Sequence, residues 1–357
     1  MKKIDFSFIV HSRDRTDLPR KFPLLKYIPR NVFDWLTLSL KPFIVSKITG
    51  VKSIKDNEDL TGAVIGISMT AHQLLENRSL ALKRIIEAVK LSKKRGAKYV
   101  ALGAMTASLS KGGKDVIDNI PDIYVTTGRT YTVKNITDYV EFCISKFSLD
   151  KENIKIGIIG AAGGIGSGVA ISLAKKGFKK FVLIDLERKM ERIKSNLIIL
   201  EKHAENSEII TSHKLNEITQ CKIIIAATSS PEIVLKSSDV ESGTIIINDA
   251  QPSDVDPEII KNRKDVLVLE GGVLHTENVN CHFNFGLRHK NDIFSCLGEA
   301  ILLSSLKFEG HCSIDGFDQA LYDNLSEVSD KLGFKICPQN VHAVIDEEKI
   351  TNFELSL

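Results

Sequence analysis

Short apolar runs alternate with amphipathic stretches over the first 150 residues. Four of the runs are typical of buried strands: residues 6–10, 64–67, 98–102 and 123–126. Residues 80–95 carry apolar side chains at helical spacing, and Gly96 follows as a natural stop. Another helix is expected just after Gly128. Strands that alternate with helices predict an N-terminal α/β substrate domain over residues 1–150.

Residues 20–45 are harder to assign, because their apolar side chains are interleaved with five basic residues and three prolines. The segment can cover an apolar substrate channel, contact a membrane surface, or pack as an N-terminal cap. The usual burial of apolar helix faces favours the packed cap.

From Asn153 onward the alternation of strands and helices becomes regular. Apolar runs rich in Ile and Val recur at residues 155–159, 181–184, 222–226, 244–247 and 266–269. Such unbroken runs are typical of parallel strands that are buried on both faces of a sheet. They predict a Rossmann-type, doubly wound parallel sheet over residues 151–285. Residues 286–357 are expected to be a largely helical C-terminal segment, with its clearest helix at 293–306.

A glycine-rich turn follows the first of these strands in the sequence IGIIGAAGGIGSGVA. Gly160 lets the chain turn out of the strand, Gly163 lets the backbone approach a pyrophosphate, and Gly166 lets helix and strand pack closely. The helix N-terminus adds N–H groups and partial positive charge for phosphates. The motif predicts a dinucleotide site made by Gly160, Ala161, Gly163, Gly164, Ile165 and Gly166. The alternative is a glycine-rich loop that holds no ligand.

Asp185 ends the second strand of this region, nineteen residues after Gly166. A carboxylate there can bind the ribose hydroxyls of NAD and repel the 2′-phosphate of NADP, whereas Arg188 just beyond it can do the reverse. The small residues Ala227, Thr228 and Ser229 follow a later strand and can lie beneath the nicotinamide. Gly272 follows the last strand and allows either close approach of a ligand or a tight turn.

Cys296 is the candidate nucleophile, in the segment NDIFSCLGEAILLSSL. Asp292 or Ser295 can cap the expected helix, which places Cys296 near its first turn. A helix N-terminus stabilises a thiolate, and a thiolate can form a thioester that hydride then reduces. A cysteine that only packs in the helix is the alternative.

The chain resembles the long-chain acyl–acyl-carrier-protein reductases of cyanobacteria and their bacterial relatives, which share an arrangement with shikimate dehydrogenase and glutamyl-tRNA reductase. Four segments carry the resemblance: VALGAMTAS (100–108), VTTGRTYT (125–132), IGIIGAAGGIGS (156–167) and IFSCLGEAILL (293–303). The resemblance implies that Cys296 is the acylated nucleophile, that the substrate is a fatty acyl thioester, and that the product is an aldehyde. It also favours NADPH, whereas Asp185 favours NADH, so both cofactors stay open.

His275 after the last strand and Tyr131 in the Thr-rich turn are candidate donors of a proton to a developing alkoxide. The leading hypothesis is therefore an NAD(P)H-dependent thioester reductase. A shikimate- or amino-acid-type dehydrogenase with direct hydride transfer, in which Arg129 holds a carboxylate, is the second. A nucleotide-binding protein without catalysis is the third.

Charge is distributed unevenly along the chain. Residues 1–55 hold twelve lysines and arginines against four acidic residues, and residues 80–98 hold seven against one. Either a solvated surface or an acidic partner such as acyl-carrier protein explains this excess, and peripheral membrane contact stays open. No RNA-binding motif suggests a nucleic-acid partner.

The six cysteines are scattered, with no CxxC pair, which argues against zinc and against a disulfide framework. The apolar run at the N-terminus stops at Val10, and no run of about 18 apolar residues occurs. We therefore expect a cytoplasmic protein with no metal site and no transmembrane segment.

Overall fold

The structure is a computed structural model that describes residues 3–203, 207–314, 316–340 and 344–357. The chain forms two compact units, each assembled from three stretches of sequence. Unit 1 comprises Met1–Tyr131, Leu274–Asp315 and Asp323–Lys335, and unit 2 comprises Thr132–Val273, Gly316–Tyr322 and Ile336–Leu357. The three-part division at residues 150 and 285 stays a prediction about folding domains.

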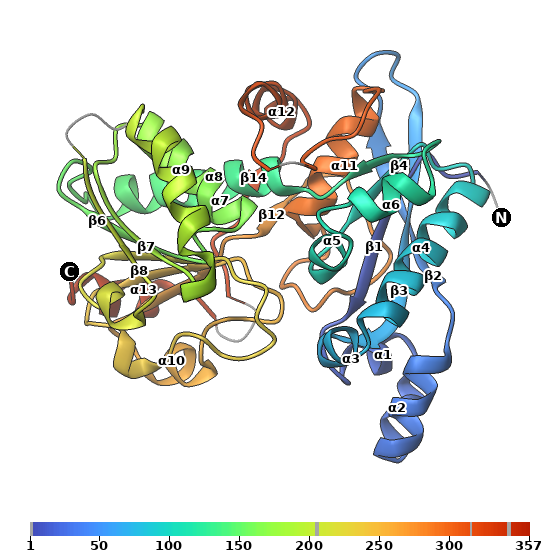
Figure 1. Cartoon of the computed structure of the whole chain (residues 1–357), viewed down its shortest axis with the longest axis horizontal. Helices are drawn as coiled ribbons and strands as arrows, with labels where there is room; N and C mark the ends of the chain where they lie inside the picture. The colour runs from blue at the N-terminus through green and yellow to red at the C-terminus, as the bar shows by residue number, and fades with distance from the viewer. Residues whose placement is uncertain (1–2, 204–206, 315, 341–343) are drawn as a thin grey trace. The chain divides into compact units, whose positions relative to one another are not determined.

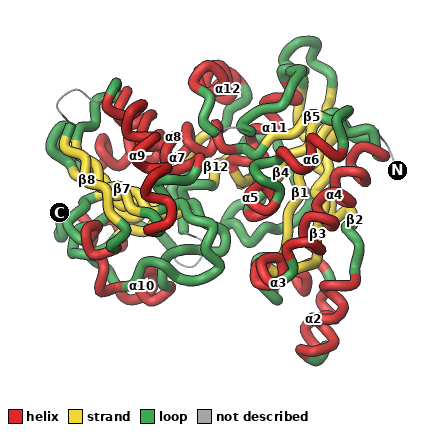
Figure 2. Tube along the Cα trace, in the orientation of Figure 1, coloured by secondary structure: helices red, strands yellow, loops and turns green. Residues whose placement is uncertain are grey.

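Unit 1 is built on a five-stranded sheet of order β2-β3-β1-β4-β5, whose strands are drawn in yellow in Figure 2. The strands are β1 (Phe6–Ser12), β2 (Phe43–Lys52), β3 (Asp59–Thr70), β4 (Tyr99–Leu102) and β5 (Tyr124–Thr126). All pair in parallel except β2, which runs antiparallel to β3. The four strands predicted in this region are confirmed. β2 was not expected, because it begins within the basic, proline-containing segment of residues 20–45, whose structure the apolar pattern left open.

Short helices and one long helix surround the unit 1 sheet (Figure 1). They are α1 (Asp17–Lys21), a 3-10 turn (Pro23–Tyr27), α2 (Arg30–Ser39), α3 (Ala71–Glu76), α4 (Arg78–Lys94), α5 (Met105–Leu109), α6 (Lys114–Asn119) and α11 (Ser295–Ser305). The predicted amphipathic helix is α4, whose Ile85 and Val89 are buried with Ile65 and Leu102 of the sheet. α11 comes from far along the chain and packs against β1 and β4.

Unit 2 contains a six-stranded parallel sheet of order β11-β10-β9-β6-β7-β8, which is the strand order of a dinucleotide-binding Rossmann fold. Its strands are β6 (Lys155–Ile159), β7 (Lys180–Ile184), β8 (Glu208–Ser212), β9 (Ile223–Ala226), β10 (Ile245–Asn248) and β11 (Leu267–Glu270). The predicted α/β fold class is therefore confirmed, with β6 in the interior of the sheet. β8 was missed because only Ile209 and Ile210 of this edge strand are large and apolar.

Both faces of the unit 2 sheet are covered, which explains the unbroken apolar runs. Ile158, Ile223 and Ile225 contribute to one core, whereas Ile224 and Ile246 contribute to a second core. The helical segments are α7 (Arg129–Lys146), which continues from unit 1, α8 (Gly164–Lys175), α9 (Met190–Glu201), α10 (Pro257–Asn262) and α13 (Glu347–Glu354), with 3-10 turns at Glu187–Lys189, Leu215–Ile218 and Ser237–Asp239.

The last part of the chain is less helical than expected. A third sheet of order β13-β12-β14 is formed by β12 (Val273–His275), β13 (Asp292–Phe294) and β14 (Lys335–Ile336). The helix expected at 293–306 begins only at Ser295, and α12 (Gln319–Lys331) and α13 supply the rest of the helical content. Within the described residues, no helix is both long enough and apolar enough to cross a membrane.

Candidate functional site

The nucleotide residues predicted from the sequence lie at the carboxyl edge of the unit 2 sheet. Ile159 pairs with Ile184 and Ala226, and Ala226 pairs in turn with Asn248, which pairs with Glu270. The turns that start at Gly160, Asp185, Ala227, Asp249 and Gly271 therefore leave the sheet at the same level. Ligands of open α/β sheets bind in this position, outside the carboxyl ends of the strands.

The glycine turn has the geometry that the motif predicts. Gly160 has φ +85°, and a Cβ atom there would lie 2.5 Å from Ala227 O. A Cβ atom at Gly166 would lie 2.4 Å from Gly160 O, so helix and turn are in close contact. At Gly163 the nearest such atom is Gly160 O at 3.0 Å, and α8 begins there without a side-chain cap. The uncapped amides of α8 fit the phosphates of a dinucleotide.

Asp185 is buried and bonded to its own chain. Its Oδ2 accepts a hydrogen bond from Ala162 N at 3.0 Å, and its Oδ1 accepts one from Leu186 N at 2.8 Å. Lys189 Nζ lies 3.1 Å from Oδ1, whereas Arg188 is exposed in the following turn. The carboxylate therefore supports the glycine turn in this structure, a role that strand position alone did not predict.

Thr228, in the turn after β9, is held by a carboxylate that the sequence analysis missed. Its N–H and Oγ1–H donate to the two oxygens of Asp254 at 3.0 and 2.6 Å. Burial raises the pKa of Asp254 to about 6, although both hydrogen bonds from Thr228 act in the opposite direction. Ala227 before Thr228 is half-buried, and Ser229 after it is exposed. The two hydrogen bonds to Asp254 therefore hold this turn of small residues in place.

Gly272 has a packing role that its position did not reveal. A Cβ atom there would lie 2.4 Å from Asp249 Oδ1, so the glycine makes room for this carboxyl group. Burial, followed by the charges of Asp254 and Glu270, raises the pKa of Asp249 to about 8. The sequence analysis did not single out these acidic residues, because only the folded chain brings Asp249 and Asp254, which follow β10, close to Glu270 at the end of β11.

Unit 1 holds the candidate nucleophile. Cys296 is the second residue of α11 and is half-buried. The expected capping is wrong: Phe294 is the N-cap and makes no side-chain cap, and Asp292 belongs to β13. A Cβ atom at Gly128 would lie 2.3 Å from Cys296 Cα and Cβ, so only glycine fits the turn beside the cysteine. The structure therefore brings together two of the segments that carry the family resemblance.

Glu299, one helical turn after Cys296, ties these two segments together. Its buried carboxylate accepts from the hydroxyl groups of Thr126 and Ser313, the latter at 2.7 Å, and from Tyr131 N at 2.8 Å. Burial raises the pKa of Glu299, and these hydrogen bonds with one from Gly128 N oppose that rise. The sequence analysis missed Glu299. The sequence did contain a clue, because Glu299 is a single acidic residue within the otherwise apolar run LGEAILL. An acidic side chain requires hydrogen-bond partners once its helix is buried.

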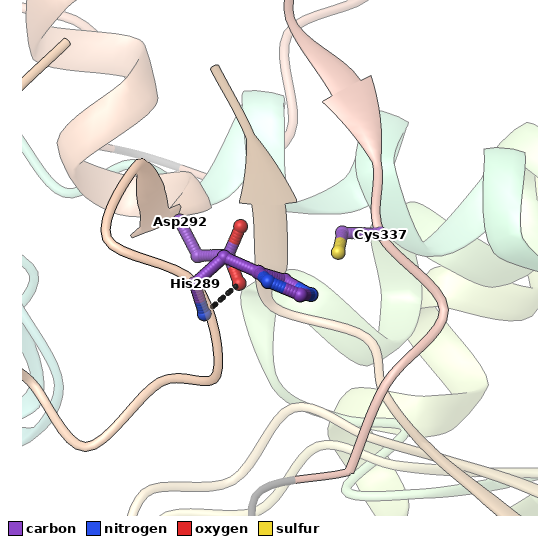
Figure 3. Close-up of side chains that lie close together, drawn as sticks. All are labelled: His289, Asp292 and Cys337. Atoms are coloured by element: carbon purple, nitrogen blue, oxygen red, sulfur yellow. Dashed lines mark hydrogen bonds between the residues drawn. The ribbon is translucent and has the colours of Figure 1, made fainter. Parts of the chain in front are cut away.

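His275, in β12, is oriented by a buried acid in β13. Its Nδ1 lies 2.8 Å from Asp292 Oδ1, and Asp292 is fully buried. The other oxygen of Asp292 accepts from the backbone N–H of His289 at 3.0 Å (Figure 3). This bond joins an ionised carboxylate to the His275 tautomer that carries its proton on Nδ1, because such a carboxylate only accepts hydrogen bonds. Such a His–Asp pair is suited to proton transfer through Nε2.

Tyr131 and Arg129 occupy structural positions at the start of α7. The Tyr131 ring is buried and packs against Gly298, where a Cβ atom would lie 2.9 Å from the ring. Arg129 Nη1 donates to Ile314 O at 3.3 Å. Both residues therefore help to fix the Gly128 turn, which lies beside Cys296.

The cysteines differ in accessibility. Cys143, Cys221, Cys281 and Cys312 are buried, and burial raises the pKa of the first three to about 12. Cys296 and Cys337 are the half-buried ones. Of these two, only Cys296 lies at the start of a helix.

Three comparisons with known proteins relate this geometry to known families. Residues 143–269 match the model of the Shikimate / quinate 5-dehydrogenase family. The chain is 22% identical over 365 residues to "Aminotransferase PigE" of Serratia sp., covering 98% of this chain and 42% of that protein. It is 26% identical over 218 residues to the glutamyl-tRNA reductase of Caldivirga maquilingensis, covering 60% and 48%. The chain thus spans less than half the length of these two relatives.

The long-chain acyl-[acyl-carrier-protein] reductase of Synechococcus elongatus is 23% identical over 307 residues, covering 82% of this chain and 85% of that protein. Among solved structures, quinate dehydrogenase from Corynebacterium glutamicum in complex with NAD has a TM-score of 0.31 at 12% identity, covering 69% of this chain and 79% of that one. L-tryptophan dehydrogenase from Nostoc punctiforme has a TM-score of 0.40 at 11% identity, covering 93% and 80%. TM-scores this low assign no function to the chain. The doubly wound sheet and its glycine turn, together with the match over residues 143–269, indicate a dinucleotide-binding unit.

The glycine turn makes a paired prediction. Gly163→Val should fold normally, because only Gly160 O is close, and should lose nucleotide binding. Gly166→Val should destabilise the protein by about 2 kcal/mol or more, because its Cβ meets backbone atoms. Thermal unfolding and titration with NADH and NADPH measure both effects. Normal nucleotide binding by folded Gly163→Val would contradict the assigned phosphate position.

Glu299 makes a second paired prediction. Glu299→Leu should lower the free energy of unfolding by about 3 kcal/mol or more, because it leaves Tyr131 N–H and two hydroxyl groups in the interior without their acceptor. Glu299→Gln should lower it by about 1 kcal/mol. The folded-state pKa of Glu299 is raised, so its contribution to stability should fall as the pH rises through that pKa. Denaturant unfolding across a pH series measures both effects. Equal destabilisation by Leu and Gln, or the same pH slope in Glu299→Gln as in the wild type, would refute this description.

Proposed function

We propose that the protein is an NAD(P)H-dependent reductase of acyl thioesters that releases an aldehyde through an acyl-cysteine at Cys296. The supporting observation is the setting of Cys296, a half-buried thiol in the first turn of α11 beside the Gly128 turn. A helix N-terminus favours a thiolate and offers N–H groups to a carbonyl oxygen. The similarity to the Synechococcus long-chain acyl-[acyl-carrier-protein] reductase supports the same substrate class.

The cofactor would be held at the carboxyl edge of the unit 2 sheet. The amides from Gly163 to Gly166 would bind the pyrophosphate, and the turn from Ala227 to Ser229, anchored by Asp254, would lie under the nicotinamide end. A bound NAD(P)H supplies hydride. Asp185 at the ribose position favours NADH, although Lys189 and Arg188 beside it supply positive charge suited to NADPH. Both cofactors therefore belong in the assay.

The proposed reaction begins when the Cys296 thiolate attacks the acyl carbon. A new C–S bond forms, the bond to the carrier sulfur breaks, and the carrier leaves as a thiol after taking up a proton. Two electrons and a hydrogen then reach the acyl carbon as hydride, and a proton reaches its oxygen. The resulting thiohemiacetal breaks its C–S bond, releasing the aldehyde and the Cys296 thiol.

His275 is the proposed proton donor in this sequence. Asp292 holds Nδ1, which fixes the ring and leaves Nε2 to exchange the proton with the thiohemiacetal oxygen. Tyr131, the other candidate, is buried against Gly298 and helps to fix the turn through its backbone N–H. We therefore assign Tyr131 a positioning role.

Cys296→Ser is the direct test. The variant keeps the shape of the site but has a far weaker nucleophile, so aldehyde formation should fall by at least about a thousandfold while NAD(P)H still binds. Incubation of the wild type with an acyl thioester and no nucleotide should leave one acyl group on the peptide that contains Cys296. Cys337→Ser is the matched control, because Cys337 is also half-buried, and it should retain activity.

If Cys296→Ser still reduces the thioester and the peptide stays unmodified, the acyl-cysteine step is wrong. Reduction of a small keto or imino acid by both proteins would then favour the dehydrogenase alternative, with direct hydride transfer.

The carrier is proposed to be an acidic acyl-carrier protein that docks on α4. Lys83, Lys90 and Lys94 are exposed on this helix, and a depression beside it is lined by Lys90, Lys93, Lys94, Asn119 and Asp122. Lys93 pairs with Asp122 at 2.6 Å, which leaves the other lysines of the depression to meet a partner. A positive surface of this kind attracts an acidic protein.

Salt dependence tests this docking. Attraction between charged surfaces is screened beyond about 8 Å at physiological ionic strength, so turnover of carrier-bound substrate should fall steeply with added salt. Turnover of a short acyl thioester should change little. Lys90→Glu/Lys94→Glu should raise KM for the carrier-bound substrate alone. Equal salt dependence for both substrates would exclude the docking surface.

A further inference from the structure

The segment from α1 to α2 presents an unusual set of exposed apolar side chains. Leu24, Tyr27 and Trp35 are 79%, 73% and 67% exposed, and Phe22 and Val32 are 44% exposed. The packed cap favoured by the sequence is therefore wrong for these residues. Soluble surfaces rarely gather large apolar side chains in this way without a partner.

The segment is held firmly to unit 1, so its exposure is a fixed feature of the fold. Phe33 is buried, Thr37 Oγ1 donates to Gln73 Oε1 at 3.0 Å, and Ser68 Oγ donates to Thr37 O at 2.7 Å. The last turn of α2 is also bound, because Arg84 Nη2 donates to the carbonyl groups of Leu38 and Ser39 at 3.1 Å. One side of α2 is thus anchored to the unit.

The opposite side of α2 carries Val32 and Trp35, three residues apart, and faces away from this anchor. In Figure 1, α2 extends beyond the strands of unit 1 on the side where α1 and α3 lie. Val32 and Trp35 of α2 therefore stand on a projection.

Positive charge surrounds these apolar side chains. Lys21, Lys26, Arg30 and Lys41 are exposed, and no ion pair involves them within the described residues. Two acids of the same segment are already neutralised, because Asp34 pairs with Arg15 at 2.6 Å and Asp17 pairs with Arg13 at 2.7 Å. Lys26 Nζ also lies over the Tyr27 ring, 4.7 Å from its centre. The surface therefore combines unpaired cations with exposed aromatic rings.

We propose that this surface, the α2 projection, inserts its apolar side chains into an anionic lipid bilayer. Aromatic and leucine side chains settle at the level of the headgroups, and flanking lysines and arginines bind anionic headgroups. A second copy of the chain fits less well, because two such surfaces repel each other through their like charges. An acidic protein matches the charge but would need a recess for a projecting Trp35, whereas a bilayer accepts it directly. The proposal does not depend on the reaction proposed above.

Trp35 is the single tryptophan of the chain, so intrinsic fluorescence reports this surface directly. Mixing the intact protein with phosphatidylcholine–phosphatidylglycerol vesicles should shift its emission to the blue, and brominated lipids should quench it. Vesicles of phosphatidylcholine alone should give a much smaller shift. Added salt should weaken the binding, because the headgroup attraction is electrostatic.

Two variants separate the apolar and the charged contributions while leaving Trp35 in place. Leu24→Asp/Tyr27→Asp should abolish the shift. Lys21→Glu/Lys26→Glu/Arg30→Glu should weaken vesicle binding by at least about a hundredfold, since each cation near an anionic surface contributes about a factor of five. Ile198→Asp/Ile199→Asp is the matched control, because it charges two exposed apolar residues of α9 and should leave binding unchanged. Circular dichroism checks that each variant is folded.

Results of three kinds would overturn the proposal. The first is an unchanged emission spectrum with anionic vesicles, or an equal loss of binding in the α9 control. The second is a blue shift that follows protein concentration without lipid and accompanies dimer formation in sedimentation. The third is a blue shift produced by an acidic carrier protein and not by vesicles.

Discussion

The buried carboxylate of Glu299 is the interaction on which the candidate catalytic region of unit 1 depends. A carboxylate removed from water must be met by donors, and here they come from the end of β5, from the start of α7 and from Ser313. These contacts bring the Thr-rich turn against the first turn of α11. Gly128 can then lie directly beside Cys296, because a glycine leaves room for the cysteine backbone. The surroundings of the Cys296 thiol therefore depend on the hydrogen bonds of Glu299, one helical turn away.

Both sheets place their candidate functional groups at carboxyl ends of parallel strands. In unit 2, five turns leave the sheet at one level, and in unit 1 the Thr126–Gly128 turn follows β5. Parallel pairing makes this arrangement general, because all strand ends of one polarity meet at a single edge. The edge in unit 2 carries phosphate-binding geometry, whereas the edge in unit 1 carries a thiol and a network of hydroxyl groups. The two edges therefore carry different chemical groups.

The apolar pattern and the glycine motif predicted the nucleotide-binding sheet well, because unbroken Ile and Val runs and a strand–glycine–helix turn are local signals. The predicted 155–159 strand matches β6 in full. The sequence did not predict contacts between residues that lie far apart along the chain. Nothing near Asp292 in the sequence indicates that it belongs to a strand and orients His275, and nothing near Gly272 reveals that Asp249 packs against it. Hydropathy likewise could not distinguish Phe33, which anchors α2, from Trp35 on its outer side.

The interleaved order of the two units has a consequence for how the protein is made. The chain passes from unit 1 to unit 2 after Tyr131, returns at Leu274, and only then supplies α11, which packs against β1 and β4. During synthesis, the first 131 residues must wait without this helix while the whole nucleotide-binding sheet leaves the ribosome. Until that moment Thr126 and Tyr131 lack Glu299 as their partner. Unit 1 therefore begins first but is closed only after the sheet of unit 2 has been made, and the last stretch of the chain, Ile336–Leu357, closes unit 2. Cutting the chain at either of these crossings would separate residues 1–131 from the thiol-bearing helix.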